Sequence, residues 1–241
     1  MSLEQIEQMA INLSNIGVCI VLLIGGEPFV RNDIAKIVKA FTNVGIHVRM
    51  QTNGIATEKQ LTECVAAGGH DISISLDSLQ FDIQDQINGG FTKSWDNAIH
   101  TMSLVNKLFP ENGTAFFNTV LMPKNLFDME DLIKFATAIG WGVSIVPVHT
   151  TSTNEPKSYR TFDDKSVVTF EEHQYSEVKK VIQNLKILRK KGYNVYDSDD
   201  YLDDVYRFVV GEPLKWRQRN NNVCDSPNLY FAIAPNGNLK V

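Results

Sequence analysis

The stretch that decides the fold of this chain is residues 18–28, which read VCIVLLIGGEP. Its apolar run, residues 18–24, has the length of a buried strand and is too short to span a membrane. Two glycines, an acid and a proline follow directly where this strand should end. Ligands bind at this end of parallel strands, and glycines let a backbone approach a ligand closely. From these four residues alone, a tight turn is an equally good interpretation.

Strand and helix patterns alternate along the rest of the chain. Short connections between them predict parallel strands joined by right-handed crossovers. We expect a polar loop or lid at 150–168 and a β-hairpin around the Asn-Gly pair at 236–237. The other expected strands cover 47–51, 72–76, 114–121, 143–148 and 193–196. The expected helices cover 3–15, 32–42, 94–108, 129–139, 171–191 and 199–210. A further helix is expected to begin at Thr57, which has capping-box spacing with Gln60, and to stop at the glycines at 68–69.

Composition limits the class of protein. The chain has 241 residues and a net charge of −5, with no strongly basic stretch, so we expect no nucleic-acid partner. No run of 18 apolar residues and no signal-peptide pattern occur, so we expect no membrane segment and a cytoplasmic location. The three cysteines lie far apart, which argues against a disulfide framework. Cys19 and Cys64 are expected to be small core residues.

Small and polar residues recur at the ends of successive expected strands. Each has a structural explanation as a turn, a cap or a strand end. Parallel strands bring these ends together on one rim, which is the usual ligand site of such folds. The sequence therefore predicts a binding site on this rim. Its candidate residues are Gly25, Gly26, Glu27, Pro28, Asn53, Ser75, Asp77, Asn118, Val146 and Pro147.

With GGEP at 25–28, TNG at 52–54 and SLDS at 75–78, the chain resembles a radical SAM enzyme of the MoaA/PqqE-like superfamily. The resemblance covers about residues 5–241. It implies an α/β fold, a (βα)6 partial TIM-like barrel, which is incomplete here because the parallel sheet lacks its first strand. It also implies two cofactors, S-adenosylmethionine (SAM) and a [4Fe–4S] cluster held by a CxxxCxxC loop. Reductive cleavage of SAM then yields a 5′-deoxyadenosyl radical that abstracts a substrate hydrogen.

The resemblance also implies roles for the rim residues. Gly25, Gly26 and Glu27 would meet the amino group of SAM, largely through their backbone oxygens. Ser75 and Asp77 would lie near its ribose or carboxylate, and Asn118 could reach it from the next strand. The pair at 146–147 would border the adenine. Many relatives carry an arginine after the SLD strand, whereas this chain has Asn88 near the aligned position.

The C-terminal part resembles the opening of a SPASM extension, which binds auxiliary iron–sulfur clusters through thiolates. Cys224 and Gly237 have the spacing of that opening. The resemblance implies that Cys224 is a cluster ligand in the complete protein and a free thiol here. We therefore divide the chain into a radical SAM core at 4–198 and the start of a SPASM-like extension at 199–241.

One departure from the family is decisive, since no CxxxCxxC occurs anywhere in the chain. We expect a fragment cut at both ends, with a vector-like start at Met1–Leu3 that we leave out of the fold. A natural relative that lost its redox chemistry is the competing explanation. As given, the chain is expected to be inactive and to bind no cofactor. The missing strand should also expose a sheet edge through which two copies could dimerise.

Three functional interpretations remain. The first is the core of an iron–sulfur oxidoreductase that acts through SAM on a peptide or a small molecule. The second is a non-catalytic partial barrel that serves as a binding or interaction module. The third is an unrelated barrel enzyme without a metal. The substrate is not readable from this fold, because loops and appended domains select it.

Overall fold

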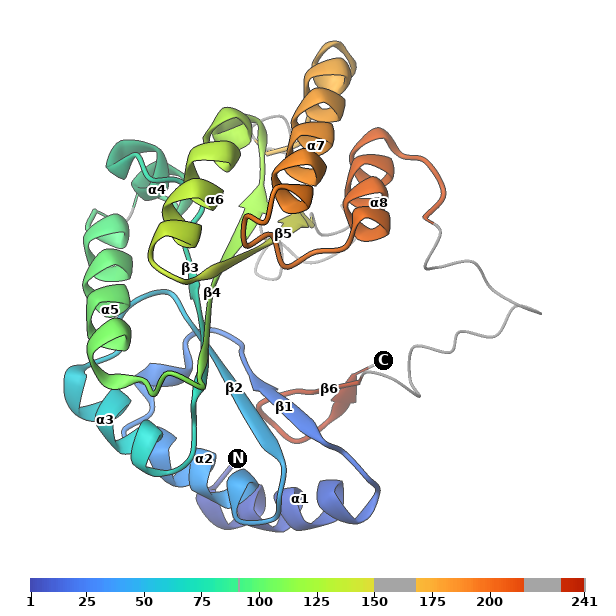
Figure 1. The fold of residues 1–241 in the computed structure, drawn as a ribbon. Coiled ribbons are helices and arrows are strands. Elements are labelled where there is room, and N and C mark those ends of the chain that lie inside the picture. Colours follow the sequence, from blue (N-terminus) through green and yellow to red (C-terminus); the bar gives the residue numbers. More distant parts are fainter. Residues whose placement is uncertain (91, 150–167, 215–230, 241) are drawn as a thin grey trace.

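The computed structural model describes residues 1–90, 92–149, 168–214 and 231–240 (Figure 1). Its centre is a five-stranded parallel sheet with the strand order β1-β2-β3-β4-β5. The strands follow each other in space as they do in sequence, as expected for a right-handed βα succession. Their bounds are Ile20–Leu23 (β1), His47–Thr52 (β2), Asp71–Ser75 (β3), Thr114–Leu121 (β4) and Gly142–Pro147 (β5).

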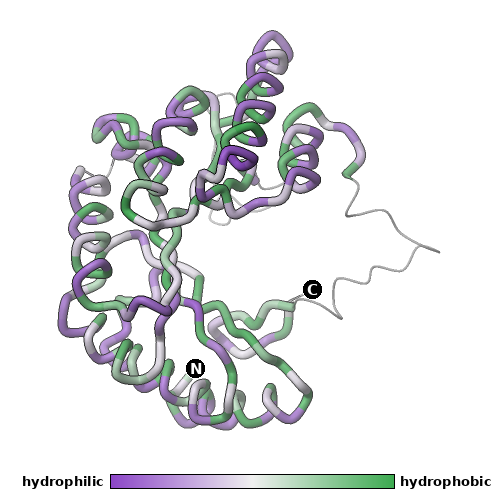
Figure 2. The backbone as a smooth tube through the Cα atoms, viewed as in Figure 1, coloured by the Kyte–Doolittle hydropathy of each residue, from purple (hydrophilic) through white to green (hydrophobic). Residues whose placement is uncertain are grey.

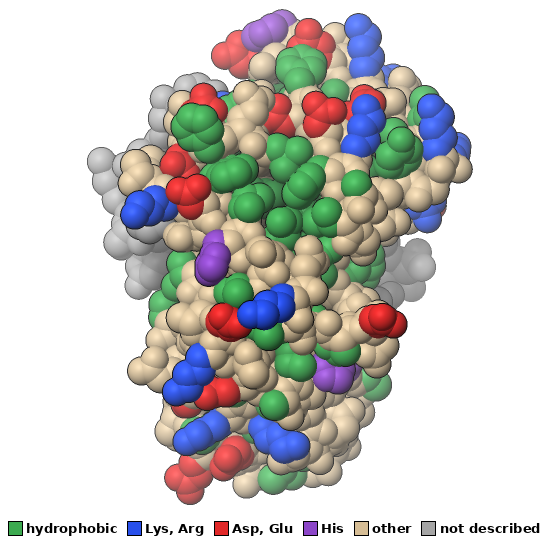
Figure 3. All heavy atoms as spheres, turned by 60° about the vertical axis from the view of Figure 1, so that its left-hand side comes forward, with side chains coloured by type: hydrophobic (Ala, Val, Ile, Leu, Met, Phe, Trp, Pro, Cys, Tyr) green, Lys and Arg blue, Asp and Glu red, His purple; other side chains and the backbone are tan. Residues whose placement is uncertain are grey.

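Helices form an outer arc around one side of the sheet, and its other side faces the open part of the arc (Figure 1). This arrangement confirms the predicted partial barrel. Figure 3 shows the outer helical face, where Lys and Arg lie among Asp and Glu, and hydrophobic side chains gather in the upper half. The helices are Leu3–Asn15 (α1), Ile34–Thr42 (α2), Glu58–Ala66 (α3), Phe81–Ile87 (α4), Ser94–Leu108 (α5), Met129–Ala138 (α6), Tyr175–Lys190 (α7) and Asp199–Val210 (α8). In the part of the chain that the structure describes, 3-10 turns cover Pro28–Val30, Pro123–Asp128 and Glu172–Gln174.

Alternation along the strands separates two faces of the sheet. On β2, Val48 and Met50 are buried, whereas Arg49 and Gln51 are only half-buried. Strand register extends this division across the sheet. We call the second set the concave face, and its members are Ile20, Leu22, His47, Arg49, Gln51, Asp71, Ser73, Ser75, Thr114, Phe116, Asn118, Val120, Gly142, Ser144 and Val146.

The expectation that the apolar run at 18–24 forms a buried strand was wrong. β1 lies at the edge of the sheet, and the side chains of Ile20, Leu22 and Ile24 are 64%, 37% and 50% exposed. Its sequence is hydrophobic throughout (Figure 2), but only one neighbouring strand covers it. Cys19 just before β1 is exposed, so its expected core role was also wrong, whereas Cys64 in α3 is fully buried.

The predicted sixth strand is reduced to a single parallel bridge between Val143 and Val195. The Asn-Gly hairpin does form, as β6 (Ala232–Ile233) paired antiparallel with β7 (Leu239–Lys240). α8 packs into the same core as the barrel helices through Leu202 and Val205. Residues 150–167 of the predicted loop at 150–168 lie outside the described residues, and so does Cys224. Within the described ranges, no helix has both the length and the hydropathy to cross a membrane.

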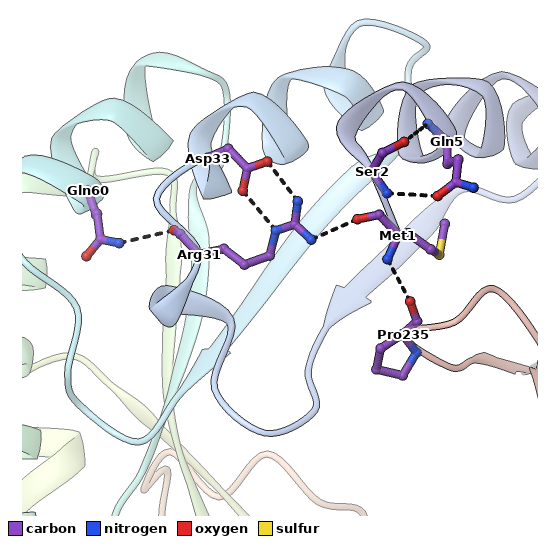
Figure 4. Close-up of polar contacts among 7 residues, drawn as sticks. All are labelled: Met1, Ser2, Gln5, Arg31, Asp33, Gln60 and Pro235. Atoms are coloured by element: carbon purple, nitrogen blue, oxygen red, sulfur yellow. Dashed lines mark hydrogen bonds and ion pairs between the residues drawn. The ribbon is translucent and has the colours of Figure 1, made fainter.

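Leaving Met1–Leu3 out of the fold was wrong, because Leu3 is the first residue of α1 and the two residues before it make hydrogen bonds that hold the N-terminus. Ser2 is the N-cap, and its side chain and that of Gln5 form a reciprocal capping box. The terminal amino group of Met1 donates to the Pro235 carbonyl at 2.9 Å, which joins the N-terminus to the C-terminal hairpin (Figure 4). Arg31 donates to the Met1 carbonyl at 3.1 Å and makes a bidentate pair with Asp33. The N-terminus is thus held at two points.

Candidate functional site

The loop after β1 has an open, unpartnered backbone. Gly25 and Gly26 have φ of +93° and +49°, a region that favours glycine. Both are exposed, and a Cβ atom added at either would meet no atom within 4 Å. Among the described residues, nothing forms a hydrogen bond with the backbone of either glycine. The loop therefore offers free carbonyl groups at the end of β1.

The Glu27 carboxylate braces this loop against β2. It accepts hydrogen bonds from the Phe29 N–H at 2.9 Å, the Thr52 hydroxyl at 3.0 Å and the Asn53 N–H at 2.6 Å. The first bond caps the 3-10 turn that begins at Pro28. The Glu27 side chain is thus engaged within the protein. The backbone of Gly25 and Gly26, by contrast, makes no hydrogen bond within the described residues.

The TNG loop follows β2 and lies beside the GGEP loop. The Thr52 hydroxyl accepts from the Gly54 N–H at 3.1 Å, and Asn53 is exposed. Gly54 has φ of +101°, and a Cβ atom there would lie 2.6 Å from the backbone nitrogen of Ala98 in α5. Close approach of α5 therefore requires glycine at this position. Asn53 is the only residue of the three whose side chain is free to reach the rim.

Ser75 and Asn118 lie side by side on the concave face, since they are register partners on β3 and β4. Both are half-buried. The Asn118 amide donates to the Gln51 side-chain oxygen at 3.0 Å and to the Ser73 hydroxyl at 3.2 Å. This gives a polar band across three strands. The structure therefore brings together two of the predicted site residues and adds Gln51 and Ser73.

Asp77 is not presented to the rim, which corrects the expectation that its carboxylate lies near a ligand. Its side chain is only 5% exposed and accepts from the Val120 N–H at 2.7 Å. Its own N–H donates to Gln84 at 2.7 Å, and its carbonyl accepts from Asn125 at 2.8 Å. Burial raises the pKa of Asp77 to about 6, although the Val120 hydrogen bond lowers it. Asp77 joins β3 to β4 and to the segments that follow each strand.

The two predicted residues on β5 point to opposite faces. Val146 pairs in register with Val120, is half-buried and belongs to the concave face. Pro147 pairs with the fully buried Leu121 and lies on the helix side of the sheet. Val146 can therefore border a ligand, whereas Pro147 packs into the core. His149, the next histidine along, packs against the Phe208 ring with centroids 4.8 Å apart.

The described residues do not fit an iron–sulfur cluster. Cys19 is exposed at the sheet edge, and Cys64 is buried in α3, where burial raises the pKa of its thiol to about 12. No group of three His, Cys, Asp or Glu side chains in the described ranges could hold a metal ion. SAM is different, because the open GGEP backbone and the polar band suit its amino group and its polar substituents. The residues present thus fit the organic cofactor and not the cluster.

Sequence reasoning missed Gln84 and Asn125, which hold the Asp77 loop, because such side-chain contacts leave no spacing signal. It also missed Arg49, Gln51 and Ser73. A signal for these was present, since polar residues occupy every second position of β2 and β3. This period-two pattern marks a polar face on an otherwise buried strand.

Comparisons with known proteins give consistent results. The probable GTP 3′,8-cyclase of Thermococcus kodakarensis is 39% identical over 87 residues, which are 36% of this chain and 28% of that protein. The PqqA peptide cyclase of Rhodopseudomonas palustris is 28% identical over 143 residues, 58% of this chain and 36% of that protein. This chain therefore spans about a third of the length of these curated relatives.

The crystal structure of Streptococcus suis SuiB bound to S-adenosylmethionine shares the fold, with a TM-score of 0.61 and 16% identity. The match covers 81% of this chain and 42% of SuiB. At this identity, the likeness concerns the fold alone. The family model described as the radical SAM superfamily matches residues 1–136, more than half of the 241 residues. The predicted family is thereby confirmed, and the chain belongs to the radical SAM superfamily.

Proposed function

We propose that residues 4–198 are the SAM-binding core of a radical SAM enzyme, and that 199–241 begin a SPASM-like extension. The observation that carries the proposal is the exposed backbone of Gly25 and Gly26 at the end of β1, which makes no hydrogen bond with any described residue and lies beside the concave face. An ammonium group is a donor without an acceptor, so free carbonyls suit it. The division at 198 follows the family resemblance, and α8 on its C-terminal side packs into the barrel core through Leu202 and Val205.

The chain's own residues would bind and orient SAM. The carbonyls at 25–26 accept hydrogen bonds from its amino group, and the Ser75 hydroxyl is offered to its ribose or carboxylate. Both Asn118 N–H groups already donate to Gln51 and Ser73, so its side-chain oxygen would accept from a ribose hydroxyl. Val146 gives an apolar border to the adenine. Glu27 positions the loop through its three hydrogen bonds rather than by touching the ligand. In this family, SAM supplies the radical that abstracts hydrogen from a substrate.

The cluster is a different matter, and we propose that this chain alone does not cleave SAM. Its three cysteines lack the spacing that a [4Fe–4S] site needs, so ligands for the cluster would have to come from outside these residues. Cys224 is proposed as a ligand of an auxiliary cluster in the complete protein. Anaerobic reconstitution with iron and sulfide should give no stoichiometric iron and no 5′-deoxyadenosine. Stoichiometric iron together with that product would contradict the proposal.

For the substrate, we propose a peptide or a small metabolite in the cytoplasm. The support for a peptide is the similarity to a peptide cyclase, although this chain covers only 36% of that relative. The concave face is the side of the sheet on which such a substrate would lie next to SAM.

SAM binding to the chain can be measured by isothermal titration calorimetry. We expect an affinity weaker than micromolar. Gly25→Ala adds a methyl group to the open space of the loop and should weaken binding about 10-fold. Gly45→Ala is the matched control, because Gly45 also has positive φ (+79°) and open surroundings but lies between α2 and β2, at the other end of the strands.

Equal binding by the Gly25 and Gly45 variants would show that the loop does not hold SAM. Complete absence of binding would favour the second candidate, a non-catalytic partial barrel that acts as an interaction module. One observation favours that candidate, namely the exposed apolar edge strand β1. An unpaired strand edge can pair with another chain, and a dimer through β1 is the simplest form of such an interaction.

A further inference from the structure

Arg49 occupies an unusual place on the concave face. It is the third residue of β2, two positions before Gln51, and its side chain is half-buried. Its register partners are Leu22 on β1 and Asp71 on β3. A guanidinium in such a position loses part of its hydration, so it normally needs an anion or another acceptor.

Two aromatic rings hold the Arg49 guanidinium. Its central carbon lies 4.7 Å from the centroid of the Phe116 ring and 5.6 Å from that of Tyr196. The two rings pack edge to face, with centroids 4.9 Å apart and an interplanar angle of 74°. A cation held over an aromatic face keeps its N–H donors available in its own plane. The rings thus orient a planar fork of donors on the concave face.

No carboxylate neutralises this guanidinium within the described part of the chain. The nearest candidate by register is Asp71, but its carboxylate pairs with His47 and accepts from the Thr114 N–H at 2.8 Å and the Thr114 hydroxyl at 2.5 Å. Burial acts to raise the pKa of Asp71, yet the Thr114 and His47 hydrogen bonds outweigh it and lower the pKa. Asp71 is therefore charged and already committed.

The other arginines in the described ranges behave differently from Arg49. Arg31 pairs with Asp33, Arg189 with Asp199 and Arg207 with Asp204. Arg49 alone among them makes cation–π contacts and no hydrogen bond or ion pair. Since Arg is suited to bidentate binding of carboxylates, an arginine that is oriented but unpaired points to an absent anion.

A second donor lies beside Arg49. The Gln51 side-chain oxygen accepts from Asn118, which leaves the Gln51 amide N–H groups without a partner among the described residues. The local charge also limits the ligand. One guanidinium stands beside one committed carboxylate, so a singly charged anion suits the site better than a phosphate with two charges.

We propose that Arg49 binds a carboxylate of the substrate, with Gln51 as the second donor, and thereby selects acidic peptides. The inference rests on the proposed function only in taking the concave face as the substrate side. The carboxylate is the side chain of an acidic residue or the end of a peptide chain. Arg49 is a specificity-determining residue and takes part in no bond-breaking step.

The test measures peptide binding to the full chain without SAM, with fluorescence anisotropy at low ionic strength as the readout. The probe is a labelled, C-terminally amidated pentapeptide of glycine and glutamate, compared with its glutamine counterpart. We expect the acidic peptide to bind at least 10-fold more tightly, the size expected of one charge-assisted bidentate pair. A third peptide, neutral but with a free C-terminal carboxylate, distinguishes the side-chain source from the chain-end source.

Three variants complete the design. Arg49→Met keeps packing against Phe116 and should abolish the preference for the acidic peptide, whereas Arg49→Lys should keep part of it. Lys179→Met is the matched control, because it also removes one charge and one cation–π contact (5.8 Å to the Tyr206 ring) but does so at an exposed position on α7. A shift of the Arg49 Nε–H resonance in the NMR spectrum during the peptide titration gives a readout independent of affinity.

Equal affinity for the acidic and glutamine peptides would overturn the proposal. An unchanged preference in Arg49→Met would overturn it as well, and so would displacement of the acidic peptide by pyrophosphate but not by glutarate. A lower melting temperature of Arg49→Met, with no peptide binding by the unaltered chain, would make Arg49 a packing residue only. Because SAM is absent from this assay, its result is independent of the SAM titration that tests the proposed function.

Discussion

The Glu27 carboxylate accepts a 2.6 Å hydrogen bond from the backbone N–H of Asn53, which ties the end of β1 to the end of β2. The two residues come from GGEP, the most specific motif of the family resemblance, and from TNG. The acid of the first motif therefore holds the second motif in place. The Glu27 side chain makes the contacts that fix the loop, whereas the backbone of Gly25 and Gly26 makes no hydrogen bond with any described residue.

Replacing Glu27 with Gln should lower the free energy of unfolding by about 1–3 kcal/mol. A neutral amide keeps one acceptor oxygen and loses the charge that strengthens three hydrogen bonds. Urea unfolding measures the change. Glu63→Gln is the control, since Glu63 makes only an exposed pair with Lys59 at 3.8 Å and should cost less than about 0.5 kcal/mol. Equal losses in both variants would contradict the brace.

Stability should depend on pH through Asp77. Its pKa rises from 3.8 when unfolded to about 6 when folded, so the folded state holds a proton that the unfolded state releases. This contribution is full below about pH 3.8 and is lost as the pH rises through about 6. In Asp77→Asn, the side-chain oxygen can still accept from the Val120 N–H. The free energy of unfolding of this variant should therefore fall by about 3 kcal/mol less than that of the unaltered chain as the pH rises.

The measurement is urea unfolding of the Asp77 variant and of the unaltered chain at several pH values from 4 to 7.5. Asp82→Asn, at an exposed position in α4, is the matched control and should leave the pH profile unchanged. Asp197 keeps its own dependence in both, because burial raises its pKa to about 6 as well. An identical profile in the Asp77 variant would show that the carboxyl does not hold the proton.

Gly54→Ala should destabilise the protein by roughly 3–5 kcal/mol. The new methyl group would enter the backbone of α5 at 2.6 Å, and φ of +101° adds strain for any L-residue. Gly140→Ala tests the strain alone, because Gly140 has φ of +78° and open surroundings. Thermal unfolding of both variants separates the two effects. Similar melting temperatures would contradict the close approach of α5.

The edge of β1 should support a dimer at micromolar concentration. Light scattering coupled to size exclusion measures the mass. Ile20→Lys places a charge on the edge strand and should yield the monomer, because such charges oppose strand pairing. Ile187→Lys on α7 is the control, since Ile187 is 49% exposed but lies outside the sheet. A strictly monomeric unaltered chain would contradict this expectation.

Much of the fold was predictable, because it depends on local patterns. The helix at 94–108, the strand at 114–121 and the helix at 199–210 have the bounds expected from hydrophobic periodicity. The capping box of Thr57 and Gln60 forms as well. α4 was missed, since it is short and carries few periodic apolar residues. The sixth strand was overestimated, because a strand pattern does not say whether a partner is present.

The candidate site was only partly predictable. Gly25, Gly26, Asn53, Ser75, Asn118 and Val146 lie on the rim or the concave face as expected, and their binding roles stay predictions. Asp77 and Pro147 are buried instead. The two groups have the same kinds of motif in the sequence. They differ in the face of the sheet on which their side chains lie and in the segments that pack against them. A motif of a few residues contains neither kind of information.

The sequence by itself determined the order of strands and helices and the placement of GGEP and TNG at strand ends, because both follow from local periodicity and turn chemistry. Tertiary structure alone decided which polar groups are free. Glu27 and Asp77 are both acids that follow a strand. The Glu27 carboxylate accepts hydrogen bonds from Thr52 and Asn53, and the Asp77 carboxylate accepts one from the Val120 N–H, so donors from distant parts of the chain occupy both. Arg49 has no ion-pair partner among the described residues, because the Asp71 carboxylate binds Thr114 and His47. Such competition for partners is settled only when the strands come together.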